Sequence, residues 1–301
     1  MFRTAMSSVR RCLVGALAAG VAFGTGAAAD PKPSAEADAG GVVLGADLVK
    51  TGLYLITGGG SNSLLRLSQS GSILVDGKQA GSYRALMSQV RKISKLSDLP
   101  ARVVIVTDHH EHHTGNHAQF LAAGIAVIAQ QNAKPRLPAG PAPGAKPVGP
   151  VVTFDREYKL HMGGIEVDLY HFGNGHSDND TVVHFPDMKV IAVGDLYSTA
   201  APEPDFAGGG SLAGWGPELD QLLKLDFDVV VPSVGPLLAR ADLVAFKVKV
   251  DTLVARANAL VKQGVAKDQL LAQLKTDDLG WRLNFTTEQL DRLYSDLSAS
   301  R

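Results

Sequence analysis

The sequence contains almost no cysteine. Its single cysteine, Cys12, lies in an N-terminal segment with the features of an export signal, too early for a lipoprotein cleavage site. The exported chain is therefore predicted to have no thiol, no disulfide bond and no thiolate metal ligand. Any metal ion must be bound by histidine, aspartate or glutamate.

An excess of one charge is also missing. The chain has 29 basic and 30 acidic residues, a formal net charge of −1. Proteins that bind nucleic acid or anionic membranes through surface charge usually carry a marked basic excess. The composition therefore gives no reason to expect either partner, and the substrate is expected to be a small molecule.

No apolar run in the chain is long enough to span a bilayer comfortably. The longest one near the N-terminus, Leu13–Phe23, follows three arginines and precedes an Ala-Ala-Ala stretch at 27–29. This order is typical of a cleavable signal peptide, which we place at residues 1–29. The Arg10-Arg11 pair resembles a twin-arginine signal. The mature protein is predicted to be periplasmic or secreted, without stable membrane insertion.

The histidines, in contrast, are concentrated. All nine fall between His109 and His184, and five lie between His109 and His117. The densest segment is Asp108–His113 (DHHEHH), which follows a β-branched run, Arg102–Val106, typical of a buried strand. Alternate residues in this segment can point the same way, so several ligands can converge. Imidazole and carboxylate groups together suit zinc, iron or manganese.

Strand-like and helix-like segments alternate along the chain, which predicts an α/β fold. After a flexible lead-in at 30–42, we predict one domain over 43–240 and a C-terminal helical extension over 241–301 packed on the same domain. Predicted strands are 53–56, 63–67, 72–75, 102–106, 151–154, 165–171, 181–185, 190–193 and 228–231; predicted helices are 82–96, 243–261, 266–274 and 287–297. Two loops rich in glycine or proline, 134–150 and 207–215, are predicted to form pocket walls.

Five segments resemble elements of the metallo-β-lactamase superfamily, in the same order and at similar spacing. They are His110 with His113-Thr114-Gly115, Ile73–Asp76, Gly175-His176-Ser177 with Asp180-Thr181, Val193-Gly194-Asp195 and Val231–Pro236. The resemblance implies an αβ/βα sandwich, in which two mixed sheets pack face to face between helices and metals lie at the sheet edge.

Three positions depart from the family pattern. The first histidine of the His-x-His-x-Asp-His motif is Asp108, its aspartate is His112, and the histidine of the last element is Val234. The first two changes exchange an imidazole and a carboxylate within one loop. The third removes a ligand, because no histidine follows His184.

The remaining residues still supply two sets of three metal ligands. The resemblance implies one set of Asp108, His110 and His176, and a second of His112, His113 and Asp195. Three protein ligands leave an open position, as a catalytic zinc ion requires. We therefore expect one or two zinc ions, with iron as the alternative.

The resemblance implies an exported hydrolase of an ester, amide, lactone or β-lactam, acting through a metal-bound hydroxide. His112 occupies the place of the aspartate that orients the water, so His112 and Asp108 are the predicted catalytic residues; Glu111 is a further carboxylate in reach. Asp76 is expected to hydrogen-bond a ligand imidazole, and Asp180 either to do the same or to cap a turn.

Two other functions remain open at this point. His110, His176 and Asp195 form a two-histidine, one-carboxylate set of the kind that binds a single catalytic iron in oxidoreductases. Alternatively, the chain is a non-catalytic member that binds a ligand in the old cleft. Of the other residues, His109 is expected to point away from the metals, His117 to lie on the surface, and Tyr197 and Ser198 to line the pocket.

Overall fold

The computed structural model describes residues 41–94, 101–137 and 151–299. The predicted signal peptide, nearly all of the lead-in and residues 138–150 of the predicted pocket loop lie outside this part of the chain. Within it, none of the helices is long and apolar enough to cross a membrane.

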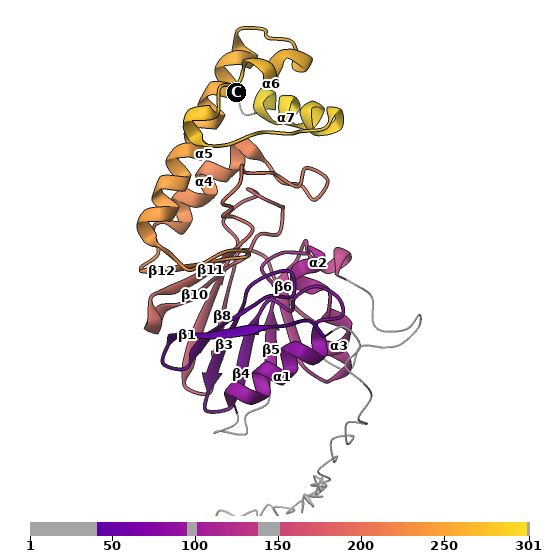
Figure 1. Ribbon diagram of the computed structural model, residues 1–301, viewed down its shortest axis with the longest axis vertical. Helices are drawn as coiled ribbons and strands as arrows, with labels where there is room; N and C mark the ends of the chain where they lie inside the picture. Colours follow the sequence, from indigo (N-terminus) through magenta and orange to yellow (C-terminus); the bar gives the residue numbers. More distant parts are fainter. Residues whose placement is uncertain (1–40, 95–100, 138–150, 300–301) are drawn as a thin grey trace, which may run out of the picture. The chain divides into compact units, whose positions relative to one another are not determined.

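The first sheet has seven strands that follow one another in chain order (Figure 1). Strands β1 to β4 pair antiparallel, and β4 to β7 pair parallel. Their bounds are β1 (Gly45–Lys50), β2 (Leu53–Thr57), β3 (Ser63–Ser68), β4 (Gly71–Val75), β5 (Ala101–Ile105), β6 (Ala126–Gln130) and β7 (Val151–Phe154).

The second sheet has six strands in the order β13-β12-β11-β10-β9-β8. Its pairs are antiparallel except for β11 and β12, which run parallel. The bounds are β8 (Glu157–Met162), β9 (Ile165–Tyr170), β10 (Val182–Phe185), β11 (Val190–Gly194), β12 (Val229–Pro232) and β13 (Leu238–Ala239).

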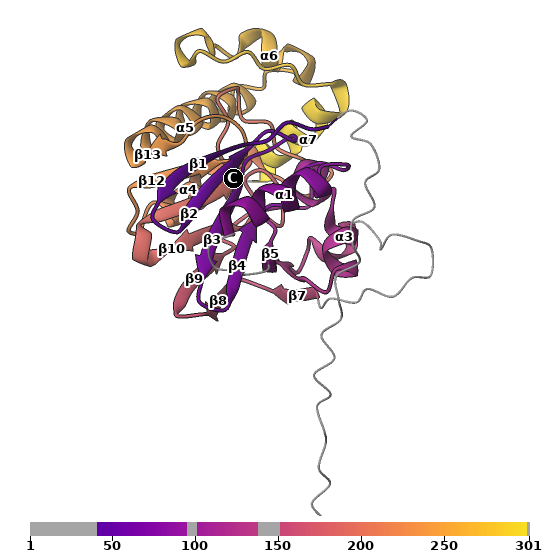
Figure 2. The ribbon, with the colours of Figure 1, turned by 60° about the horizontal axis from the view of Figure 1, so that its bottom comes forward.

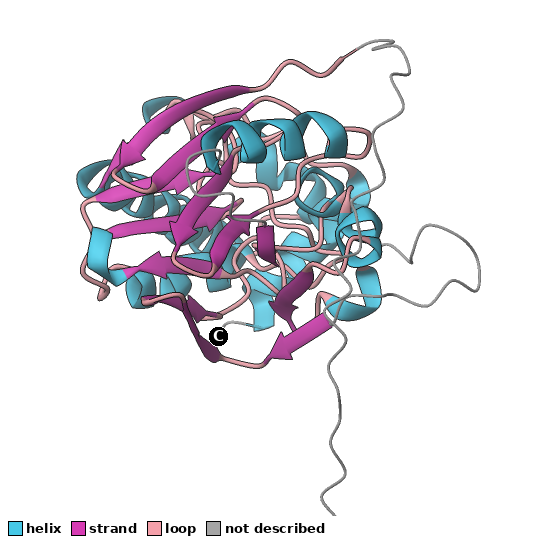
Figure 3. Cartoon of the chain, turned by 90° about the horizontal axis from the view of Figure 1, so that it is seen from below, coloured by secondary structure: helices cyan, strands magenta, loops and turns pink. Residues whose placement is uncertain are grey.

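The helices lie outside the strands (Figures 2 and 3). They are α1 (Tyr83–Ser94), α2 (Glu111–Thr114), α3 (His117–Ala122), α4 (Leu212–Leu222), α5 (Arg240–Lys262), α6 (Leu270–Gln273) and α7 (Thr287–Ala299), with four 3-10 turns, Lys134–Arg136, Pro186–Met188, Lys267–Gln269 and Asp277–Leu279. Residues of α1 and α3 pack on the first sheet, residues of α4 and α5 pack on the second, and α7 packs against α4 and α5.

The alternation of side chains along the strands builds the layers. In β4, Ile73 and Val75 pack between the sheets while Leu74 packs beneath α1 and α3. In β11, Ala192 faces the other sheet and Val193 faces the helices α4 and α5. Because both faces are buried, these strands are apolar throughout instead of alternating with polar residues. The fold is the αβ/βα sandwich that the family resemblance implied.

Four strands (β1, β6, β8 and β13) and two helices (α2 and α4) were not predicted. β1 is mostly exposed, β6 has five residues and β13 two, so their sequences give weak signals, whereas β8 (EYKLHM) alternates polar and apolar residues and does carry a strand signal. The helix α4 begins inside the glycine-rich stretch that was predicted to be a loop. Its start is stabilised by Ser211, whose Oγ accepts a hydrogen bond from the Gly214 amide at 2.8 Å.

Loops from both sheets meet at one edge. Asp76 follows β4, the Asp108–His113 segment follows β5, Asp195 follows β11, and Ser233 follows β12. Two backbone hydrogen bonds hold the sheets together there, from the Thr181 amide to the Thr107 carbonyl at 2.7 Å and from the Asn62 amide to the Ser233 carbonyl at 2.6 Å. The predicted metal ligands are therefore brought to one place by strand ends.

Candidate metal centre

The segment after β5 is fixed to the end of β4 through Asp76. One oxygen of this carboxylate accepts hydrogen bonds from the amide of Thr107 (2.9 Å) and from its hydroxyl (3.0 Å). The other oxygen lies 2.9 Å from Nδ1 of His113. The predicted contact between Asp76 and a candidate ligand imidazole is therefore present.

His113 is fully buried, and its second nitrogen faces two further carboxylates. Nε2 lies 3.5 Å from Oδ2 of Asp108 and 3.5 Å from Oδ1 of Asp195. With Nδ1 against Asp76, the ring presents Nε2 to these oxygens. Burial lowers the pKa of His113, but Asp108 and Asp76 outweigh burial and raise it well above its usual value, so without a metal ion this nitrogen carries a proton. A lone pair facing two carboxylate oxygens is unfavourable unless a proton or a cation lies between them.

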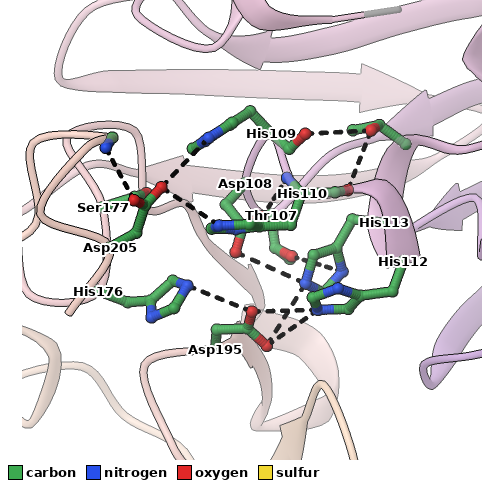
Figure 4. A network of polar contacts seen from close by, with 12 residues as sticks. Thr107, Asp108, His109, His110, His112, His113, His176, Ser177, Asp195 and Asp205 are labelled. Atoms are coloured by element: carbon green, nitrogen blue, oxygen red, sulfur yellow. Dashed lines mark hydrogen bonds and ion pairs between the residues drawn. The ribbon is translucent and has the colours of Figure 1, made fainter. Parts of the chain in front are cut away.

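Asp195 is the centre of the cluster, as Figure 4 shows. Its Oδ2 lies 3.0 Å from Nε2 of His112 and 3.3 Å from Nε2 of His176, while Oδ1 faces His113. Three imidazoles from two distant segments thus point at one carboxylate.

Asp108 and His110 form the inner end of the same cluster. Oδ1 of Asp108 accepts the His110 amide at 2.7 Å and lies 2.9 Å from its Nδ1. The second oxygen of Asp108 has no hydrogen-bond partner although it is buried. Nε2 of His110 lies 3.3 Å from Oδ2 of Asp205, a residue that the sequence analysis did not select.

The loop that carries His176 is held by two buried carboxyl groups. Asp180 accepts the amides of His176 (2.8 Å) and Ser177 (3.0 Å), and Glu218 of α4 accepts the amide of Gly175 (2.6 Å). Of the two roles considered for Asp180, the structure places it as the cap of a turn. Nδ1 of His176 donates to the Glu203 carbonyl at 3.1 Å, which turns its Nε2 toward Asp195.

Two observations indicate that these donor atoms can bind a metal ion. First, three buried atoms without a hydrogen-bond partner converge here: Oδ2 of Asp108, Nε2 of His113 and Nε2 of His176. Second, most nitrogen–oxygen distances across the cluster are 3.3–3.5 Å. That is longer than a charge-assisted hydrogen bond, at about 2.7–2.9 Å, and equals the roughly 3.4 Å between two ligands of a tetrahedral zinc ion.

The ligand atoms of the two predicted sets lie close together, with Asp195 added to the first set. Those of Asp108, His110, His176 and Asp195 all lie within 4.8 Å of one another, and so do those of His112, His113 and Asp195. Asp195 belongs to both sets. A third set, His109, His110 and Asp205, shares His110 with the first.

The electrostatics favour a cation. Burial raises the pKa of the Asp195 carboxyl, but hydrogen bonds from His112 and His113 hold it well below its usual range. Burial likewise opposes ionisation of Asp108, and the nearby His113 and His110 lower its pKa to about 2. Both carboxylates are therefore ionised at neutral pH. Their charge is compensated by protonated imidazoles, since the pKa of His110 is raised to about 10 and that of His113 well above its usual value, or by a metal cation that displaces those protons.

Val234, which stands in place of the last family histidine, supplies no ligand. It lies in the connection from β12 to β13 with 62% of its surface exposed. The loop is held in place by Asn62, whose side-chain amide donates to the carbonyls of Pro232 and Gly235, both at 2.9 Å. These hydrogen bonds fix the loop beside the site, but Val234 presents an apolar side chain that cannot bind a metal ion.

A cavity of about 480 Å³ opens above the centre. Its floor includes His112, His176 and Asp195. Its walls are formed by Gly60, Gln79, Tyr197, Ser198, Thr199, Ala200, Ala201, Glu203, Trp215, Ser233 and Val234. The prediction that Tyr197 and Ser198 line the pocket is confirmed. From the predicted wall 207–215, only Trp215 lines it.

Two other expectations were wrong. His117 does begin a helix, but it is 4% exposed and packed in the interior instead of lying on the surface. His109 does not point away from the cluster: its Nε2 lies 3.4 Å from Oδ2 of Asp205, and its Nδ1 contacts Asn179. Asp205 and Glu218 were missed because they lie in segments without a recognisable motif and reach the site through the tertiary fold.

Comparison with known proteins places these observations in a family. The family model described as the metallo-beta-lactamase superfamily matches residues 56–234. No curated protein matches the chain significantly.

Several solved structures share the fold. A metallo-beta-lactamase from Pontibacter korlensis is 20% identical, with a TM-score of 0.59, covering 69% of this chain and 99% of that one. FIM-1 from Pseudomonas aeruginosa, solved in a mono-zinc form, is 19% identical, with a TM-score of 0.57, covering 70% of this chain and 95% of that one.

A third structure is larger than this chain. The inverting sec-alkylsulfatase Pisa1 from Pseudomonas sp. is 17% identical, with a TM-score of 0.64. The match covers 86% of this chain but 50% of the sulfatase. At these identities the likeness concerns the fold, since one fold carries many activities.

Proposed function

Because the chain belongs to the metallo-beta-lactamase superfamily, we propose that it is a metal-dependent hydrolase of a small molecule with an ester, amide, lactone or β-lactam bond. The observation that carries the proposal is the convergence of unpartnered Asp108, His113 and His176 atoms around Asp195, beneath an open cavity.

Two ligand sets are assigned in this proposal. Asp108, His110 and His176 would hold one zinc ion, and His112, His113 and Asp195 would hold a second where two are bound; Asp195 belongs to both candidate groups. Zinc bound there supplies a Lewis acid and acidifies a water molecule.

Other residues of the chain orient the candidate ligands and exclude water. Asp76 holds the His113 ring, and the Glu203 carbonyl holds the His176 ring, so that each presents Nε2 to the centre. Trp215 is buried beside His176, with its Nε1 bound to the Leu196 carbonyl at 3.0 Å, and keeps water from that side.

Proton transfer is assigned to His112 for the form of the site in which only the Asp108–His110–His176 set holds zinc, since an imidazole bound to a metal cannot act as a base. It is the most exposed of the imidazoles around Asp195, it lines the cavity, and Asp195 fixes its ring at 3.0 Å. Asp108 was the other candidate, but both of its oxygens face histidines inside the cluster and it is 1% exposed. Asp108 is therefore better suited to hold a metal than to contact a substrate.

The test is hydrolysis by the zinc-loaded protein of a panel of chromogenic esters, lactones and β-lactams. His112→Ala should reduce kcat by about 10²–10⁴-fold, the range for removal of an acid–base group. It should leave the melting temperature unchanged. The exposed His161, outside the cavity, provides the matched control His161→Ala. Full activity of the His112 variant contradicts the assignment.

Export is also proposed, on the basis of the sequence of residues 1–29. The protein should accumulate in the periplasm or medium with Asp30 as its first residue. Replacing Arg10 and Arg11 by lysine should block export if the twin-arginine route is used. N-terminal sequencing of the fractionated protein measures both.

A further inference from the structure

A further group of metal-binding side chains lies beside the candidate centre. Nε2 of His109 lies 3.4 Å, and Nε2 of His110 3.3 Å, from the same oxygen, Oδ2 of Asp205 (Figure 4). The ligand atoms of these three residues all lie within 4.8 Å of one another. The described lining of the cavity includes none of the three. This group, which we call the outer set, is therefore separate from the substrate cavity.

The spacing of the outer set suits a zinc ion better than a pair of ion pairs. Two ligands of a tetrahedral zinc ion lie about 3.4 Å apart, whereas a charge-assisted hydrogen bond joins nitrogen and oxygen at about 2.7–2.9 Å. The side chains of His109, His110 and Asp205 are 14%, 28% and 21% exposed. Two imidazoles and a carboxylate thus supply three ligands, and water can reach the fourth position.

Both imidazoles of the outer set can present a free Nε2 to a metal ion. Nδ1 of His110 lies 2.9 Å from Oδ1 of Asp108, which can accept its proton. Nδ1 of His109 lies 3.3 Å from the oxygen and 3.0 Å from the nitrogen of the Asn179 side-chain amide. This amide can serve the ring with its proton on either nitrogen. Such a contact at the second nitrogen orients a metal-binding imidazole.

The glycine-rich loop after Asp205 holds the carboxylate in place. Oδ1 of Asp205 accepts a hydrogen bond from the Gly208 amide at 2.8 Å, and the Asp205 amide donates to the His176 carbonyl at 2.8 Å. A Cβ atom at Gly208 would overlap Oδ2 of Asp205 and lie 2.8 Å from Cε1 of His109. Glycine is therefore needed for the backbone to approach the outer set this closely.

His110 belongs both to the outer set and to the inner set of Asp108, His110, His176 and Asp195. A neutral imidazole has one lone pair for a metal, so His110 can serve only one of the two ions at a time. The inner set has four candidate ligands, one of them the buried Asp108, and the outer set has three. Zinc should therefore fill the inner set first.

From this geometry, we propose that His109, His110 and Asp205 form an additional zinc site that fills only when zinc is in excess, and that its occupation inhibits the enzyme by withdrawing His110 from the inner set. The site itself stands on the geometry of the three side chains. The inhibition rests on the proposed hydrolase function.

Zinc titration with a competing chromogenic indicator tests the site without reference to catalysis. The zinc-reconstituted and dialysed full chain should take up one additional, more weakly bound zinc ion. His109→Phe keeps a ring beside Gly208 but removes the ligand, and should weaken this uptake by at least about tenfold. His161→Phe, at an exposed position on β8, should leave it unchanged. Equal uptake by both variants, or no additional zinc in the wild type, overturns the proposal.

The same titration in an Asp195→Ala background keeps the test decisive if the inner sets bind no zinc. This substitution removes a ligand common to both inner sets, so the weak ion of the outer set should remain and should be lost on dialysis. Adding His109→Phe should weaken its binding by at least about tenfold, and adding His161→Phe should not. Equal binding in the two double variants overturns the proposal.

Steady-state hydrolysis at rising free zinc tests the inhibition. Wild-type activity should fall over the zinc range in which the titration shows the outer set filling. His109→Phe should have the same rate at low zinc and need at least about tenfold more zinc for half inhibition. Inhibition at equal zinc in both proteins, or none in the wild type, overturns this part. If no substrate is hydrolysed, the proposed function fails while the titration still decides the site.

Discussion

Oδ2 of Asp76 lies 2.9 Å from Nδ1 of His113, across the edge where β4 and β5 end side by side. The contact fixes the tautomer and the direction of a fully buried imidazole. Removing such an orienting carboxylate typically lowers metal affinity by about 10–100-fold. Asp76→Asn should therefore weaken zinc binding by this factor, measured by competition with a chromogenic chelator.

The matched control is Asp47→Asn on the exposed strand β1, which removes a carboxylate remote from the cluster and should leave zinc affinity unchanged. Equal affinities in the two variants would show that Asp76 does not orient a ligand.

Val234 occupies the position from which the family pattern supplies a histidine, and it lines the same cavity as His112 and Asp195. Val234→His should restore a fourth donor and raise the affinity of the His112–His113–Asp195 set for zinc by about tenfold. Val248→His adds a histidine at a similarly exposed position on α5 and should have no effect. Isothermal titration of both variants measures the difference.

Glu218 is predicted to make stability depend on pH. Burial raises the pKa of its carboxyl from 4.5 to about 8. The folded protein therefore keeps a proton that the unfolded chain releases near pH 4.5, and the free energy of unfolding falls as pH rises from 4.5 to about 8. Each unit of difference is equivalent to about 1.4 kcal/mol.

Glu218→Gln removes this titration while its carbonyl can still accept the Gly175 amide. Relative to the wild type, the variant should gain stability by a few kcal/mol between about pH 5 and pH 8, measured by urea unfolding. Glu157→Gln at an exposed site is the control. A constant difference between wild type and Glu218→Gln across this range contradicts the account.

Lys78 is predicted to be a structural residue. Its ammonium group supplies three hydrogen bonds to backbone carbonyls in the interior, at the cost of desolvation that lowers its pKa to about 8. Lys78→Met leaves these acceptors unpartnered and should lower the free energy of unfolding by about 2–4 kcal/mol. Lys92→Met on the exposed face of α1 should change it by less than about 0.5 kcal/mol. Thermal unfolding of both variants measures this difference in stability.

Much of the fold could be predicted from local pattern. Apolar β-branched runs such as those of β4, β5 and β11 identify strands buried on both faces, and the residues just after them mark the site edge. β1 was missed because it is an exposed edge strand without a clear period, whereas β8 (EYKLHM) does alternate polar and apolar residues and was predictable from that alternation. The helix α4 was missed because Gly214, Gly216 and Pro217 disfavour helix locally, and packing of Trp215 and Leu219 in the core outweighs that preference.

The residues of the candidate site also differ in how far the sequence predicts them. The residues of the Asp108–His113 segment are adjacent in sequence, so their clustering was predictable. The positions of His176 and Asp195 required the family resemblance. Asp205 and Glu218 were not predictable, because a single acidic residue in a loop or on a helix gives no signal until the chain folds around it.

The central claim is that this rearranged set of histidines and aspartates binds zinc. Its most direct test is metal analysis of the zinc-reconstituted protein combined with zinc-edge X-ray absorption. The account predicts one or two zinc ions per chain, with only nitrogen and oxygen ligands at about 2.0–2.2 Å, and loss of zinc in Asp195→Ala. Stoichiometric iron in the purified protein would favour the oxidoreductase alternative. Absence of stoichiometric metal after reconstitution would contradict the account.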